Sequence, residues 1–166
     1  QSEAPALALV DSSIVVAWVG TDTRGVHHDA RMIGTDGLAE VVTLPLPPRQ
    51  PRAQQLLPGS SGAAQLLWLD ADEGGTIRLY SALISTPGLT VIRGPTTVSD
   101  QPALRYAALP EPGGGMLVAW AGGQPAEPSV TIQRIDNEGR PTEVIGHIQA
   151  ANFPTLLRVG SVVQLY

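Results

Sequence analysis

One spacing recurs along the chain and constrains its fold more than any other feature. Prolines that open similar segments are 46, 51 and 52 residues apart, the three tryptophans are 50 and 52 apart, and three turn glycines are 51 and 51 apart. The markers are Pro5, Pro51, Pro102 and Pro154; Trp18, Trp68 and Trp120; and Gly37, Gly88 and Gly139. Because three residue types share one period, the sequence predicts an array of repeated structural units.

The repeat predicts one domain, residues 1–166, made of the units 5–50, 51–101 and 102–153 and a partial unit, 154–166. Each unit is expected to contain four short strands. The second strand is an unbroken apolar run that ends in tryptophan, such as "MLVAW" (116–120), which is typical of a strand covered on both faces. A glycine follows the third strand, where a tight hairpin requires positive φ. In the partial unit, Tyr166 takes the tryptophan position.

Four-stranded antiparallel units of this length are typical of β-propeller blades. The predicted fold class is therefore all-β, with blades at a period of about 51 residues in an incomplete ring. Trp18, Trp68, Trp120 and Tyr166 are predicted to plug the spaces between blades, and each indole N–H needs one partner. A β-sandwich is the alternative architecture, but it does not explain the shared period.

A family resemblance rests on the proline at the first strand, the "LVAW"-like second strand and the segment "IQRIDNEG" (132–139). These motifs resemble degenerate propeller repeats of large exported bacterial proteins, which are loosely related to sialidase-type propellers. The resemblance implies a propeller and a location outside the cytoplasm: periplasm, cell surface or extracellular space. It says little about activity, because propellers have many functions.

Composition narrows the function classes. The chain has 18 Gly and 15 Pro, a net charge of −5 and no Cys, so it offers neither a basic surface for nucleic acid nor thiolate chemistry. Its longest apolar run, residues 14–19, is too short for a transmembrane helix. The first residue is Gln1, and we expect a processed protein or part of a longer one.

The number of units predicts a partner. Propellers have about four to eight blades, and an open stack would expose apolar blade faces. We expect these faces to be covered by the remainder of the polypeptide, by a second copy in a six-bladed ring, or by a different protein subunit, including one of a membrane-attached assembly.

Two polar segments are candidates for metal binding. In "VHHDAR" (26–31), His27 and His28 should point to opposite faces of a strand, and His27 with Asp29 would need a third ligand, for which His147 is the remaining histidine. We expect ordinary strand residues there.

The second segment, "DADEGGTI" (70–77), carries Asp70, Asp72 and Glu73. Their oxygens are suited to Ca²⁺, so Ca²⁺ binding is the alternative interpretation of this segment. It resembles the Asp-box of sialidase-type blades at Asp72, Gly74 and Thr76, but Asp70 and Ile77 stand where the box has Ser and Trp. It also falls between the second and third strands, whereas the Asp-box of that family lies between the third and fourth strands. An acidic hairpin loop is the preferred interpretation, with no metal and no cofactor.

No catalytic residues are predicted. "GSSG" (59–62) lacks the context of a nucleophile elbow, and the arginines are spread over the units. The prediction is therefore a non-catalytic scaffold or protein-interaction module. The alternative is a fragment of a carbohydrate-binding or sialidase-like glycoside hydrolase propeller.

Overall fold

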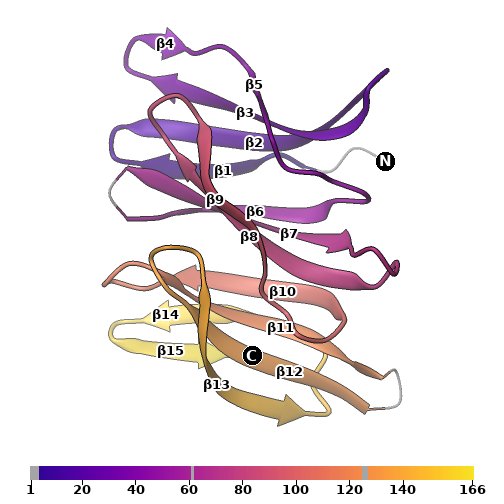
Figure 1. Ribbon diagram of the computed structural model, residues 1–166. Coiled ribbons are helices and arrows are strands. Elements are labelled where there is room, and N and C mark those ends of the chain that lie inside the picture. Colours follow the sequence, from indigo (N-terminus) through magenta and orange to yellow (C-terminus); the bar gives the residue numbers. More distant parts are fainter. Residues whose placement is uncertain (1–3, 61, 125–126) are drawn as a thin grey trace.

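The computed structural model describes residues 4–60, 62–124 and 127–166, and these contain strands and no helix. They form separate antiparallel sheets stacked one after another (Figure 1). In the first sheet, β1 to β4 follow in order and β5 also pairs with β3. The second sheet has the order β6-β7-β8-β9, the third β10-β11-β12-β13, and β14 pairs with β15. This arrangement confirms propeller-type blades in a ring that does not close.

The strand bounds follow the repeat. The first sheet comprises β1 (Ala6–Val10), β2 (Ser13–Asp22), β3 (Gly25–Gly34), β4 (Gly37–Leu38) and β5 (Val42–Leu44). The second comprises β6 (Arg52–Pro58), β7 (Ala63–Ala71), β8 (Ile77–Ser85) and β9 (Thr90–Thr97). The third comprises β10 (Ala103–Pro110), β11 (Met116–Gln124), β12 (Glu127–Ile135) and β13 (Pro141–Gln149), followed by β14 (Leu156–Val159) and β15 (Val162–Leu165). Among the sheets of the described residues, the first alone has its fourth strand in two pieces, β4 and β5.

The hydrophobic core lies between the sheets rather than within one of them. Leu66 and Trp68 of β7 pack toward the first sheet, whereas Leu67 and Leu69 pack toward the third. Successive side chains on a strand point to opposite faces, so one mid-sheet strand supplies two seams. This is why β7 is apolar without alternation and is buried along nearly its whole length.

The tryptophans lie on the face of each sheet that points toward the preceding one. Trp68 is 3% exposed in the first seam, and Trp120 is 2% exposed in the second. Trp18 has the same orientation in the first sheet, where no described sheet covers it, so it is only half-buried. Leu7 and Leu9 on the same sheet are 59% and 65% exposed. What covers this face stays a prediction.

Tyr166 does not behave as the expected plug. Leu165 packs with Leu156 against the third sheet, while Tyr166 is 68% exposed. The physical reason is strand alternation. Tyr166 follows Leu165 directly, so its side chain points to the opposite face, away from the third sheet. Gly37, Gly88 and Gly139 all have positive φ, at 107°, 85° and 80°, as their hairpin turns require.

The seams predict unequal costs for removing the tryptophans. Trp120→Ala should lower the free energy of unfolding by about 3–5 kcal/mol, because it leaves a cavity in a closed seam. Trp18→Ala should cost clearly less, since part of its ring is already exposed. Urea denaturation of both variants beside the unmodified chain measures the difference. Equal losses would mean that the face bearing Trp18 is covered in solution.

Candidate functional site

Asp70 fastens the connection between the first and second sheets. Its side chain lies near the end of β7 and is 3% exposed. The Oδ2 atom accepts a hydrogen bond from the backbone N–H of Arg49 at 3.0 Å, and Oδ1 accepts from Gln50 at 2.5 Å and Ala71 at 2.8 Å. A buried carboxylate must be paired in this way, so Asp70 holds residues 49–50 against the sheet.

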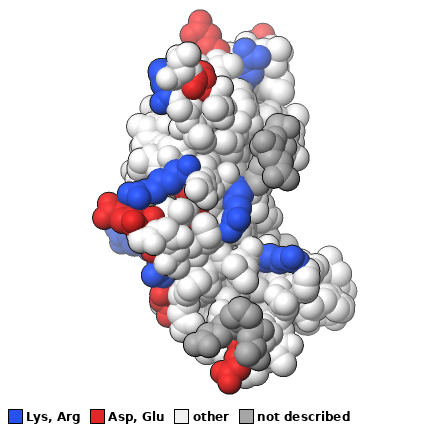
Figure 2. All heavy atoms as spheres, turned by 90° about the vertical axis from the view of Figure 1, so that its right-hand side faces the viewer, with Lys and Arg blue, Asp and Glu red and all other residues white. Residues whose placement is uncertain are grey.

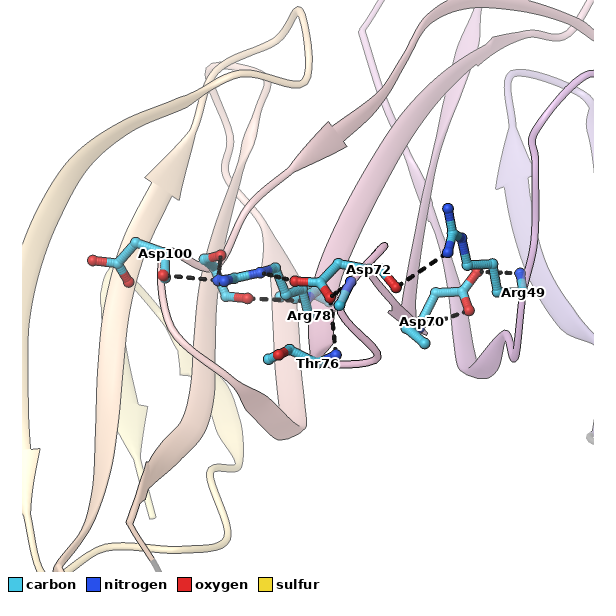
Figure 3. Close-up of polar contacts among 10 residues, drawn as sticks. Arg49, Asp70, Asp72, Thr76, Arg78 and Asp100 are labelled. Carbon is cyan, nitrogen blue, oxygen red and sulfur yellow. Dashed lines mark hydrogen bonds and ion pairs between the residues drawn. The ribbon is translucent and has the colours of Figure 1, made fainter.

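Asp72 organises the β7–β8 turn. Its Oδ1 accepts hydrogen bonds from the backbone N–H groups of Gly74 and Thr76, both at 2.9 Å, and its Oδ2 pairs with Arg78 Nε at 2.8 Å. Arg78 Nη1 also donates to the Asp100 carbonyl at 2.8 Å. Figure 3 shows this chain of contacts running from the turn to the β9–β10 connection. The Arg78 hydrogen bond, with those from Thr76 and Gly74, holds the pKa of Asp72 below 3.8.

Asp70, Asp72 and Glu73 do not form the alternative Ca²⁺ site. Asp70 is enclosed by backbone N–H groups, Asp72 is taken by the turn and Arg78, and the Glu73 side chain is 95% exposed. Within the part of the chain that the structure describes, no three acidic or histidine residues are placed to hold a metal ion. Asp70 and Asp72 therefore have separate structural tasks, because backbone and arginine donors occupy their oxygens, and Glu73 points into solvent.

Beside these carboxylates, aromatic rings meet across the first seam. Trp68 stacks on Tyr80 of β8, with ring centroids 5.8 Å apart, and His28 of β3 meets the indole edge-on at 5.1 Å. Neither the Trp68 indole N–H nor the Tyr80 hydroxyl has a hydrogen-bond partner among the described residues. The partner that each seam indole was expected to need is thus missing at Trp68.

A pocket of about 170 Å³ opens at this point. Its walls are the two aromatic rings, the acidic residues, an arginine and two prolines: Trp68, Tyr80, Asp70, Asp72, Glu73, Arg49, Pro47 and Pro95. Figure 2 faces the end of the sheets where the β7–β8 turn lies, and acidic side chains sit beside basic ones on a mostly uncharged surface. Apolar walls with a few polar groups are typical of ligand sites, and this volume is below the roughly 300–1,000 Å³ of pockets for drug-sized ligands. It suits one small ring.

Sequence reasoning did not find this pocket. Asp70, Asp72 and Glu73 were interpreted as an acidic hairpin loop, with Ca²⁺ binding as the alternative, and Trp68 was assigned to packing alone. Tyr80 was missed because it lies in an ordinary alternating strand, "IRLYSALI", although its register directly opposite Trp68 follows from a hairpin of known length. Arg49 reaches the pocket from the next sheet connection, and no local pattern signals that approach.

The histidines separate as their alternation predicts. His27 Nε2 contacts Asp29 Oδ2 at 3.1 Å on the uncovered face, and Asp29 accepts a hydrogen bond from Thr43 at 2.8 Å. His28 is fully buried in the first seam, and His147 lies on β13 beside Thr131. They do not converge on one site.

His28 is held neutral. Gln54 Nε2 donates to its Nδ1, which fixes the imidazole as an acceptor there. Burial is the main cause that lowers the pKa of His28 from 6.5 to about 4. The neighbouring Asp70 and Asp29 oppose this shift without reversing it.

The lowered pKa predicts a pH-dependent stability. The unfolded chain binds the proton at pH 6.5 and the folded chain at about 4, so stability is complete above 6.5 and falls with decreasing pH down to about 4. The loss should be about 3 kcal/mol at most. Urea denaturation at a series of pH values should show it, and His28→Leu should flatten this window. His147→Gln, at an exposed position, should not, and an unchanged profile in His28→Leu would contradict the assignment.

Comparisons with known proteins show the fold. No protein-family model matches the sequence, and no curated protein is significantly similar. A GH43_1 enzyme from Xanthomonas citri, solved with xylotriose, superposes on 99% of this chain with a TM-score of 0.64 and 12% identity. A thermostable family-43 glycoside hydrolase covers 96% with a TM-score of 0.62 and 9% identity. A GH32 β-fructofuranosidase from Bombyx mori, solved with sucrose, covers 99% with a TM-score of 0.55 and 13% identity.

These structures are five-bladed β-propeller glycoside hydrolases. The present chain spans 65%, 61% and 40% of their respective lengths. They confirm propeller-type blades, but they do not specifically support the sialidase-like part of the resemblance.

The comparisons correct the functional prediction. The non-catalytic scaffold or interaction module is contradicted, because the structural matches are glycoside hydrolases and favour the alternative of a hydrolase fragment. Sequence reasoning went wrong by treating the absence of a recognisable catalytic motif as evidence against an enzyme.

The described residues contain no helix that could cross a membrane.

Proposed function

We propose that this chain is a carbohydrate-binding part of a glycoside hydrolase-type β-propeller, and that the pocket beside Trp68 and Tyr80 holds one sugar ring. The proposal adopts the alternative that the structural matches favour. A location outside the cytoplasm fits polymeric carbohydrate substrates and is part of the proposal.

The observation that carries the proposal is a pair of solvent-accessible polar atoms on an aromatic wall. The Trp68 indole N–H and the Tyr80 hydroxyl line the pocket without a partner among the described residues. Neither atom is among the buried side-chain atoms that lack a partner, so both are open to solvent at the pocket, and a sugar hydroxyl can take the place of water there. The Tyr80 ring, which is only partly buried, offers an apolar surface beside the enclosed Trp68, while the polar atoms of both rings remain available for hydrogen bonds.

The carboxylates in the pocket are suited to binding rather than to protonating a leaving group. Glycoside hydrolysis needs a general acid whose pKa is raised. The pKa of Asp72 is instead lowered by Arg78 and the turn N–H groups, and Asp70 accepts three backbone hydrogen bonds. We therefore assign this pocket to sugar recognition, with the acid and base of any hydrolysis located elsewhere in the propeller.

The test is a titration with monosaccharides in which tryptophan fluorescence measures binding. A panel of glucose, xylose, arabinose, fructose, glucosamine and N-acetylglucosamine should include a ligand with a dissociation constant in the millimolar range or below. Tyr80→Phe should weaken its binding by about fivefold to tenfold, the value of one hydrogen bond. The stability should change little, because the hydroxyl bonds to no described residue.

Tyr106→Phe is the matched control. The Tyr106 hydroxyl donates to the backbone carbonyl of Leu67 at 3.0 Å and contacts that of Ala53 in the second seam. Its removal should lower stability without changing sugar affinity. If no sugar in the panel changes the fluorescence, or if both variants bind equally well, the proposed function is wrong.

A further inference from the structure

We propose that the sugar recognised by the Trp68–Tyr80 pocket carries a protonated amino group, as glucosamine does. This inference rests on the proposed function, and it names the ligand class from the charges around the pocket. It distinguishes amino sugars from neutral sugars and from sugars that carry a carboxylate.

The charges that line the pocket are unbalanced. Asp70, Asp72 and Glu73 contribute three carboxylates, and Arg49 contributes one guanidinium. Arg78 pairs with Asp72 and donates to the Asp100 carbonyl, but it is not part of the pocket wall. A cationic ligand would therefore be attracted, and an anionic one repelled.

The raised pKa of the Tyr80 hydroxyl indicates the same negative electrostatic field. Burial is the first cause that raises the pKa of its hydroxyl, and the carboxylates of Asp72 and Asp70 raise it further. The opposing contributions of Arg78 and Arg49 come after these in size. The negative field thus persists at the Tyr80 ring even with both arginines nearby.

Glu73 is the carboxylate that can bind an ammonium directly. The oxygens of Asp70 and Asp72 are already occupied by N–H donors. The only contact of Glu73 among the described residues is with Arg49 Nη2, at a loose 3.4 Å, and both side chains are exposed. Exposed pairs of this kind contribute little, so a ligand ammonium can replace Arg49 at low cost.

The aromatic wall is an independent reason to expect a ligand here. Trp68 is 3% exposed, lines the pocket and leaves its indole N–H without a described partner. A sugar hydroxyl would accept from this indole while the amino group lies toward Glu73. The phenol ring of Tyr80, which is only partly buried, also attracts cations through its π-electrons. Hydrogen bonds therefore select a sugar, and the charge selects the amino form.

The experiment compares glucosamine, N-acetylglucosamine and glucose by fluorescence titration at low and high salt. Glucosamine should bind about tenfold more tightly than the other two at about 20 mM salt, and the preference should shrink at about 500 mM because salt screens exposed charges. N-acetylation removes the positive charge while keeping the ring. Equal affinities, or tighter binding of N-acetylglucosamine, would overturn the inference and leave the proposed function intact.

Charge variants test the assigned partner in both directions. Glu73→Gln should weaken glucosamine binding about threefold to fivefold, and Arg49→Gln should strengthen it by a similar factor, because it removes the competing cation. Glucose binding should not change in either. Glu127→Gln, which makes the same charge change on β12 of the third sheet, is the control. Binding of no sugar at all would refute the proposed function together with this inference, whereas equal effects of Glu73→Gln and Glu127→Gln would refute the inference alone.

Discussion

The rest of the structure depends on the contact of a mid-sheet tryptophan with the sheet before it. Trp68 enters the first seam, where His28 meets its edge and Tyr80 covers its face, and Trp120 fills the second seam. Each sheet alone would leave two apolar faces in water. Stacking buries both faces of β7 in the second sheet, so the stability of one blade depends on its neighbours.

The same seam creates the pocket. Two stacked blades meet along their strands, but at the strand ends the connecting segments must cross from one sheet to the next. Asp70 fastens one such segment by its backbone, and Arg78 reaches the following one at Asp100. Polar groups concentrate there because backbone leaving a sheet needs new hydrogen-bond partners. An aromatic seam that opens between charged connections is therefore a consequence of the architecture, while its ligand depends on individual side chains.

Particular residues show which features of the fold could be predicted from the sequence. The period located β7 and predicted its burial on both faces, and alternation separated His27 from His28. The same reasoning placed Tyr166 in a seam, although the strand register turns it outward. It interpreted residues 70–77 as an acidic hairpin loop, with Ca²⁺ binding as the alternative, but it did not locate the N–H donors that occupy Asp70 and Asp72. Register at a short hairpin and the partners of a loop carboxylate depend on contacts with distant segments, which no local pattern contains.

The sequence by itself determined the repeated four-stranded unit, the apolar second strand and the all-β propeller class, because hydrophobic periodicity and turn glycines act within each unit. Only the tertiary structure decided which face of its sheet each of Trp18 and Trp68 occupies. Trp18 is half-buried on an uncovered face, whereas Trp68 is enclosed in the first seam. Only the tertiary structure brought Arg49, Tyr80 and Glu73 around one pocket. These residues lie on different elements, and the packing of one sheet against the next sets their distances.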